Sequence, residues 1–461
     1  MTGLMLVQTA AERIAQARAG LDTSLAQRSM GLVGLAAMIA IAWALSVNRS
    51  RINWRLVGIG VTLQVVFGLF ALKTAPGQAF FAGTNAVFDR LLGFTEEGAR
   101  FVFGNLVHQN VPVGTPAAGP PPDMGIIATP TAWAATGAYF AFSVLPTIIF
   151  FSALMSVMYH VGIMQWIVKS IAFVMQRTMG TSGAETLSTA GEIFVGQTEA
   201  PLLIRPFVAT MTLSELNTIM VAGFATVAGG VMAAYVGMLS PYFPDIAGHL
   251  LTASVMNAPA AIVISKIMVP EIGEPVTKGT LKLEIPKSAA NVIEAAAEGA
   301  STGLQLAINV AAMLLAFIAL VALLNFLVAS GGHLVGVEGL SMEKILGWIL
   351  APLAFLMGVP WHDAGTVGSL IGVKVVLNEF VAYLRLAGNL ESAIPLSPRA
   401  AIISTYALLG FANFASIAIQ IAGTGGIAPE RRSDLARLGL RAMIAGNLAA
   451  FGSAAIAGML V

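Results

Sequence analysis

The stretch Gly196-Gln197-Thr198-Glu199-Ala200-Pro201 sets polar and charged side chains inside hydrophobic sequence. A related cluster, Leu377-Asn378-Glu379-Phe380, occurs in the second half of the chain. A carboxylate at membrane depth is expensive, because insertion scales put its cost at about 2.5–3.5 kcal/mol. Two matching carboxylates of this kind predict a site for a polar ligand.

The composition places both clusters in a membrane. The chain has 461 residues, of which 57% are hydrophobic and only 10% are charged, whereas soluble domains carry about 25% charged residues. The net charge of +1 offers no general attraction for nucleic acid. Cysteine is absent and the histidines show no ligand spacing, which argues against a disulfide framework and a metal cofactor. We therefore expect a polytopic membrane protein without a cofactor.

Membrane spans need about 20 apolar residues each. Eight stretches meet this requirement, at 30–47, 56–73, 137–159, 216–240, 247–268, 303–329, 400–423 and 436–460. Outside them, residues 1–28 predict a short amphipathic helix, 77–105 an interfacial helix and the Pro- and Gly-rich 110–130 an extracytoplasmic loop. Residues 269–297 predict a polar linker.

Two further stretches, 183–210 and 365–388, have polar residues at their centres and predict re-entrant hairpins. Non-helical backbone is tolerated at membrane depth only where it is buried in protein or lines a cavity. Lys and Arg gather at 49–55, 266–287 and 431–441. Placing these basic residues inside puts both termini on the extracytoplasmic side of the membrane.

The two halves of the chain match in order. Three pairs of motifs carry the match: Met164–Met179 with Met342–Met357, Gly191–Gln197 with Gly372–Asn378, and Gly223–Thr226 with Gly410–Asn413. The first hairpin enters from the cytoplasmic side and the second from outside, so the repeats are inverted. Inverted repeats with a site between broken helices are typical of secondary transporters.

At these motifs the sequence resembles the concentrative nucleoside transporters. The resemblance rests on Phe194–Phe207, Asn378–Tyr383, Gly410–Ile417 and Pro429–Asp434. It implies an all-α polytopic fold with eight transmembrane helices and two re-entrant hairpins, in a homotrimer whose transport domains move like elevators against a scaffold. It also implies a non-enzymatic importer of nucleosides such as uridine in a bacterial cytoplasmic (inner) membrane.

The expected division of the chain follows from the spans and the resemblance. Residues 29–162 form scaffold helices with the interfacial helix, 163–268 the first transport repeat, 269–335 a linker and scaffold helix, and 336–461 the second transport repeat. Residues 1–28 stand apart as the amphipathic segment.

The resemblance also assigns a substrate site. It implies that the nucleobase is held by Gln197, Thr198, Glu199 and Val231, and the ribose by Glu379, Asn413 and Ser416 with Phe411 packing nearby. The chemistry agrees, because amide, hydroxyl and carboxylate groups pair with the donors and acceptors of a base edge. A carboxylate can also accept hydrogen bonds from both ribose hydroxyls.

Two cations, Na⁺ and H⁺, are candidates for coupling. The positions that match the family's sodium site are Glu192, Val195, Thr226 and Val227, and Glu192 departs from the neutral asparagine of the family. An ionised Glu192 could bind Na⁺ more strongly, which we favour, or Glu192 could exchange a proton and make the transporter proton-coupled. Lys374 could pair with a carboxylate or extend to the interface.

Two other classes of function compete. An intramembrane enzyme could use Glu199 and Glu379 as a carboxylate pair, but membrane aspartyl proteases use Asp and no HExxH metal motif occurs. A channel is a third possibility, against which the inverted repeat and its hairpins argue.

Overall fold

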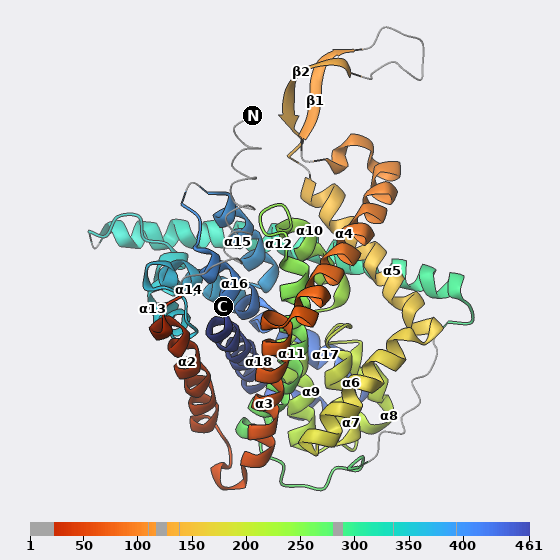
Figure 1. The fold of residues 1–461 in the computed structure, drawn as a ribbon, viewed down its shortest axis with the longest axis vertical. Helices are drawn as coiled ribbons and strands as arrows, with labels where there is room; N and C mark the ends of the chain where they lie inside the picture. The colour runs from red at the N-terminus through yellow and green to blue at the C-terminus, as the bar shows by residue number, and fades with distance from the viewer. Residues whose placement is uncertain are drawn as a thin grey trace.

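A computed structural model describes residues 23–108, 110–116, 127–137, 139–279, 289–334, 336–392 and 394–461. Most of this part of the chain is helical (Figure 1). Most of the expected segment 1–28 lies outside the described residues.

Seven helical stretches within these ranges are long and apolar enough to cross a membrane. They are α2 (Leu25–Ala44), α3 (Trp54–Lys73), η3 with α5 (Phe140–Val144, Leu145–Val161), α9 with α10 (Leu213–Ala225, Gly229–Leu239), α11 (Ile246–Met268), α12 (Val292–Leu334) and η5 with α18 (Pro429–Arg431, Arg432–Leu460). The expected crossing at 400–423 is two short helices, α16 (Pro398–Leu408) and α17 (Phe414–Ile427). The polytopic helical fold is thus confirmed, with the expected 400–423 crossing broken in the middle.

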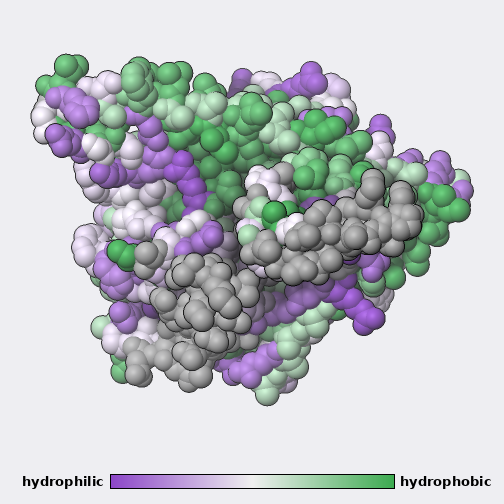
Figure 2. Space-filling model, turned by 90° about the horizontal axis from the view of Figure 1, so that it is seen from above, coloured by the Kyte–Doolittle hydropathy of each residue, from purple (hydrophilic) through white to green (hydrophobic). Residues whose placement is uncertain are grey.

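The crossings fall into an inner and an outer group. In α9 with α10, α11 and α18, 89% of the most apolar stretch is buried, whereas the values for α2, α3, α5 and α12 lie between 11% and 33%. Figure 1 shows α11 and α18 near the middle of the molecule and α2 at its edge. Seen from above, broad apolar areas cover the upper and right sides of the molecule (Figure 2). The outer helices thus present the surface that lipid or another subunit covers.

Both expected hairpins are broken at their polar centres. Helix α6 (Ile163–Met179) leads into α7 (Gly183–Gly191), η4 (Ala200–Ile204) and α8 (Arg205–Val208). In the second half α13 (Met342–Leu356) turns by 116° into α14 (Trp361–Val376), which α15 (Glu379–Glu391) follows. The helices of both hairpins stop at the polar clusters, so Gln197 and Asn378 lie at their tips.

Two connecting regions differ from expectation. The region expected as a loop at 110–130 contains the strand β1 (Asn110–Pro116) and the start of β2 (Ile127–Ala135), which pair in antiparallel fashion. β-Branched Val111 and Val113 favour this conformation, and Pro112, Pro116 and Pro130 within the strands concealed it. The helix α12 begins at Val292, within the expected linker, because residues 293–302 are rich in strong helix formers. The expected interfacial helix is α4 (Ala75–Phe103), with η1 (Arg49–Arg51) and η2 (Gly104–Val107) as short connections.

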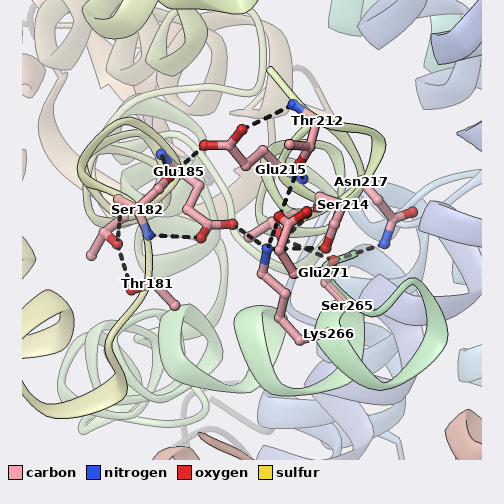
Figure 3. Close-up of polar contacts among 12 residues, drawn as sticks. Thr181, Ser182, Glu185, Thr212, Ser214, Glu215, Asn217, Ser265, Lys266 and Glu271 are labelled. Carbon is pink, nitrogen blue, oxygen red and sulfur yellow. Dashed lines mark hydrogen bonds and ion pairs between the residues drawn. The ribbon is translucent and has the colours of Figure 1, made fainter. Parts of the chain in front are cut away.

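A buried polar network anchors the base of the first hairpin (Figure 3). Lys266 at the end of α11 lies 2.8 Å from Glu185 of α7 and 3.2 Å from Glu271. Ser182 donates to Glu215 of α9 at 2.6 Å, and both residues also form capping boxes. Each capping box satisfies otherwise free backbone N–H groups at a helix start. The hairpin is therefore joined to α9 and α11 at its open end, while its tip remains free of this network.

The two broken crossings meet at their breaks. Gly410 has φ +108°, and a Cβ atom there would lie 2.4 Å from the carbonyl oxygen of Phe224. The N–H of Phe411 donates to the carbonyl of Thr226 at 3.3 Å. Asn257 and Asn447 donate to the carbonyls of Ala225 and Ala412, which lie at the two breaks. Side chains thus satisfy backbone groups that would otherwise be unpaired at membrane depth.

Candidate functional site

A cavity of about 580 Å³ lies where the two hairpin tips meet the start of α10, the start of α17 and the middle of α12. All eight predicted substrate residues line it: Gln197, Thr198, Glu199, Val231, Glu379, Phe411, Asn413 and Ser416. They come from positions far apart in the sequence. The hairpins and the broken crossings therefore do assemble one site, of a size that suits a small polar metabolite.

Glu379 is held firmly at the tip of the second hairpin. Its side chain is 4% exposed. The hydroxyl of Tyr235 donates to Oε1 at 3.1 Å, and Nδ2 of Asn413 donates to Oε2 at 3.1 Å. Glu379 also begins helix α15, where the N-terminal end of the helix favours a negative charge. Each carboxylate oxygen thus has one fixed donor and retains lone-pair capacity for a ligand hydroxyl.

Two asparagines shape the starts of the neighbouring helices. Asn378 caps α15 by accepting from the N–H of Val381 at 2.9 Å. Asn413 caps α17 by accepting from the N–H of Ser416 at 2.9 Å, while its amide nitrogen holds Glu379. One side chain therefore joins the helix break of α16 and α17 to the tip of the second hairpin.

The first hairpin tip is less constrained. Glu199 is exposed to the cavity, and within the described part of the chain its carboxylate accepts only a long hydrogen bond, 3.4 Å, from the N–H of Gly196 in its own turn. Gln197 is buried, with its Nε2 donating to Ser416 at 3.4 Å and its Oε1 accepting from Gln420 at 3.0 Å. Thr198 packs against Gly423 of α17, where a Cβ atom would meet its side chain at 2.7 Å.

Three features of the cavity wall were not anticipated from the sequence. Tyr235 and Gln420 contact the predicted residues from behind, and helix α12 contributes Ser301, Thr302, Gln305 and Asn309. Gln305 donates to Asn309 at 3.0 Å, and both side chains are exposed. Polar residues inside a membrane span face a cavity or a partner. Gln305 and Asn309 stand at positions i and i+4 of an otherwise apolar helix, and this spacing could have predicted that α12 lines the cavity.

The predicted ion residues lie behind the first hairpin tip and do not line the cavity. Glu192, Val195, Thr226 and Val227 are all buried. Oε1 of Glu192 has no hydrogen-bond partner among the described residues, and it lies 3.3 Å from where a Cβ atom of Gly223 would be. The hydroxyl of Thr226 donates to the carbonyl of Ala222 at 2.8 Å, which leaves its lone pairs free. A buried, unpaired carboxylate oxygen is a suitable ligand for a hard cation.

Lys374 contacts backbone rather than extending to the interface. Its fully buried Nζ donates to the carbonyls of Ala407 and Leu409 at 3.0 and 3.2 Å. A cation at a helix C-terminus interacts favourably with the helix dipole. Lys374 therefore caps the end of α16. Arg205 is exposed and does not line the cavity.

Three family models match successive parts of the chain. They describe a Na⁺ dependent nucleoside transporter N-terminus at residues 33–106, a nucleoside recognition gate at 141–242 and a Na⁺ dependent nucleoside transporter C-terminus at 249–458.

Relatives and solved structures agree with these models. The uncharacterized transporter YutK of Bacillus subtilis is 45% identical, over 94% of this chain and 99% of its own length. Sodium/nucleoside cotransporter 1 of Homo sapiens is 40% identical, over 95% of this chain, which spans 65% of that longer protein. The structure of CNTnw in an inward-facing substrate-bound state has a TM-score of 0.82 at 41% identity, covering 94% of this chain and 97% of that one. An outward-facing variant of CNTnw gives 0.84 at 40% identity, covering 95% and 98%.

The matches extend over nearly the whole chain, and they include the hairpin tips and the helix breaks that build the cavity. The chain therefore belongs to the family of Na⁺-dependent, concentrative nucleoside transporters, and it is a multi-pass membrane transporter rather than an enzyme.

Proposed function

We propose that this protein imports nucleosides across a bacterial cytoplasmic membrane, driven by an inward Na⁺ gradient. The observation that carries the proposal is the cavity of about 580 Å³, which is lined both by the fixed carboxylate of Glu379 and by the amide side chains of Gln197, Gln305 and Asn309. A nucleoside combines vicinal hydroxyls at one end with a flat base bearing donors and acceptors at the other, so it can satisfy both walls.

In this proposal Glu379, Asn413 and Ser416 bind the ribose, and Phe411 packs beside it. Gln197, Thr198, Glu199 and Val231 bind the nucleobase. The fixed pairing of Glu379 supports the ribose assignment, because the sugar is the part that all nucleosides share. Leaving such a group unpaired costs about 1–3 kcal/mol, which is how the site would reject analogues that lack a hydroxyl.

Glu192 would hold the coupling cation together with backbone carbonyls of Val195 and Val227 and the hydroxyl of Thr226. The unpaired Oε1 of Glu192 and the family's sodium dependence support Na⁺. A carboxylate in this place also allows proton coupling, so the two ions need to be tested separately.

The proposed movement is an elevator-like shift of the hairpins and inner helices past a fixed frame. The helix α12 packs mainly against α5 and touches α13, so it faces the hairpin tips across the cavity. Helices α2 and α3 pack instead against α18 and α11. This packing supports a fixed frame that contains fewer residues than the expected 29–162 and 269–335 and that is centred on α5 and α12. A homotrimer would cover apolar surface of α12, since only 11% of the most apolar stretch of this helix is buried in one chain.

Purified protein in sealed proteoliposomes tests the function. A Na⁺ gradient alone should accumulate radiolabelled uridine above its equilibrium level, and a pH gradient alone should not. Accumulation driven only by the pH gradient would overturn sodium coupling. Equilibration without accumulation would indicate a channel, and the absence of any uptake of uridine, cytidine or adenosine would overturn nucleoside transport.

The role of Glu192 is tested in the same vesicles. Glu192→Gln removes the charge but keeps the shape, so the Na⁺ concentration for half-maximal uptake should rise about tenfold or more. The matched control is Glu271→Gln, which changes a carboxylate of the Lys266 network at the hairpin base and should leave the Na⁺ dependence unchanged. Equal Na⁺ dependence in Glu192→Gln and wild type would move the ion site elsewhere.

A further inference from the structure

The buried side chain of Gln420 on α17 lies directly behind the cavity wall. It is 2% exposed and does not itself line the cavity. Its Nε2 atom donates to Oε1 of Gln197 at 3.0 Å and to the backbone carbonyl of Met220 on α9 at 3.1 Å. A Cβ atom on Gly223 would lie 2.9 Å from this nitrogen and 2.9 Å from the Cβ atom of Gln197, so the absence of a side chain at Gly223 permits the contact.

The Met220 carbonyl decides which way these amides point. A backbone carbonyl can only accept, so the Gln420 amide must turn its nitrogen toward Met220. The same nitrogen faces Gln197, which must therefore present its oxygen to Gln420. The reverse orientation of Gln197 would bring two NH₂ groups together. The NH₂ group of Gln197 consequently points toward Ser416, 3.4 Å away, on the lining of the cavity.

We infer that Gln420 is a positioning residue that makes Gln197 present a hydrogen-bond donor to the nucleobase, and that the pocket thereby discriminates uridine from cytidine. The inference rests on the proposed nucleoside function. Uracil has an acceptor at C4 and a donor at N3, whereas cytosine has a donor at C4 and an acceptor at N3. The two bases therefore respond oppositely to a change in the orientation of the Gln197 amide.

Two substitutions test the inference. Gln420→Met keeps the volume of the side chain but removes the donor. Gln420→Glu replaces the donor by an acceptor, so Gln197 should turn its NH₂ group away from the cavity toward the new carboxylate. Thr424→Val, one turn further along α17 and also buried, is the matched control for altered packing.

The measurement is the ratio of kcat/KM for uridine to that for cytidine in proteoliposomes. A lost or reversed hydrogen bond should change the ratio by about threefold to tenfold. We expect this change in both Gln420 variants, larger in Gln420→Glu, and an unchanged ratio in Thr424→Val. If one of the two Gln420 variants folds poorly, the other still provides the test.

A uniform loss for both nucleosides, with the wild-type ratio retained, would overturn the positioning role and leave nucleoside transport intact. An equal change of the ratio in Thr424→Val would also overturn it. Failure of the wild-type protein to transport either nucleoside would overturn the proposed function together with this inference.

Discussion

The two hairpin tips carry the same kind of residue in very different surroundings. Glu379 is buried, begins a regular helix and receives a hydrogen bond on each oxygen, from Tyr235 and Asn413. Glu199 is exposed to the cavity, lies in an irregular turn, and accepts from the residues that the structure describes only the long bond from Gly196. The second tip is therefore preorganised, whereas the first can adjust.

This difference suits a ligand with one constant and one variable end. A fixed acceptor recognises a group with constant geometry at little cost in entropy, because nothing has to be ordered on binding. At the first tip Glu199 can adjust to bases of different size, while Gln197 beside it is held by Gln420 and Ser416. The comparison leads us to expect large, substrate-independent effects at the second tip and smaller, base-dependent effects at the first.

The largest effect should come from Glu379→Gln. The substitution removes the charge that strengthens hydrogen bonds from ribose hydroxyls, and an amide NH₂ would face one of the present donors. We expect kcat/KM to fall about 100-fold for uridine, cytidine and adenosine alike. Proteoliposome uptake measures this, and retention of near wild-type uptake would remove Glu379 from the site.

Removing one donor from Glu379 should have an intermediate effect. Tyr235→Phe deletes the 3.1 Å hydrogen bond but keeps the ring, so KM should rise about threefold to tenfold for every nucleoside. Tyr383→Phe is a matched control, since its ring stacks on Tyr235 but its hydroxyl donates to the carbonyl of Thr405. Equal KM values in the two variants would show that the Glu379 hydrogen bond is unimportant for binding.

Glu199→Gln should have a smaller effect, and one that depends on the base. Its carboxylate is weakly held, so the amide can adopt a similar position at little cost. We expect changes in KM of about twofold to fivefold that differ among uridine, cytidine and adenosine. A uniform loss as large as that of Glu379→Gln would break the comparison between the two tips.

The smallest effect should come from the α12 wall. Gln305→Leu removes a polar group opposite the hairpins, and we expect about a twofold to threefold slower turnover with little change in KM. Ile308→Leu, which alters an exposed position on the same helix away from the cavity lining, serves as the control. A large rise in KM would place Gln305 in the ground-state binding site instead.

The fold and part of the cavity lining could be predicted from the sequence, each from a different signal. Glu199 and Glu379 stood out because charge is rare in apolar sequence, and their spacing within matching motifs indicated the hairpins. The resemblance then assigned Val231, Phe411 and Asn413 to the lining, where the structure also places them.

The residues behind that lining were beyond sequence reasoning. Tyr235 and Gln420 lie in apolar helices and carry no signal in the sequence, because their contacts with Glu379 and Gln197 exist only in the folded protein. The capping role of Lys374 depends on where α16 ends. The strands β1 and β2 were missed because Pro and Gly in the sequence indicate loops more often than strands.

The most direct test of the account is a comparison of uridine with 2′-deoxyuridine and 3′-deoxyuridine in wild type and in Glu379→Gln. If Glu379 holds the ribose, wild type should discriminate against at least one deoxy analogue by about tenfold or more in kcat/KM, and the variant should lose most of that discrimination. Discrimination that persists unchanged in Glu379→Gln would contradict the assignment of the sugar to the second hairpin.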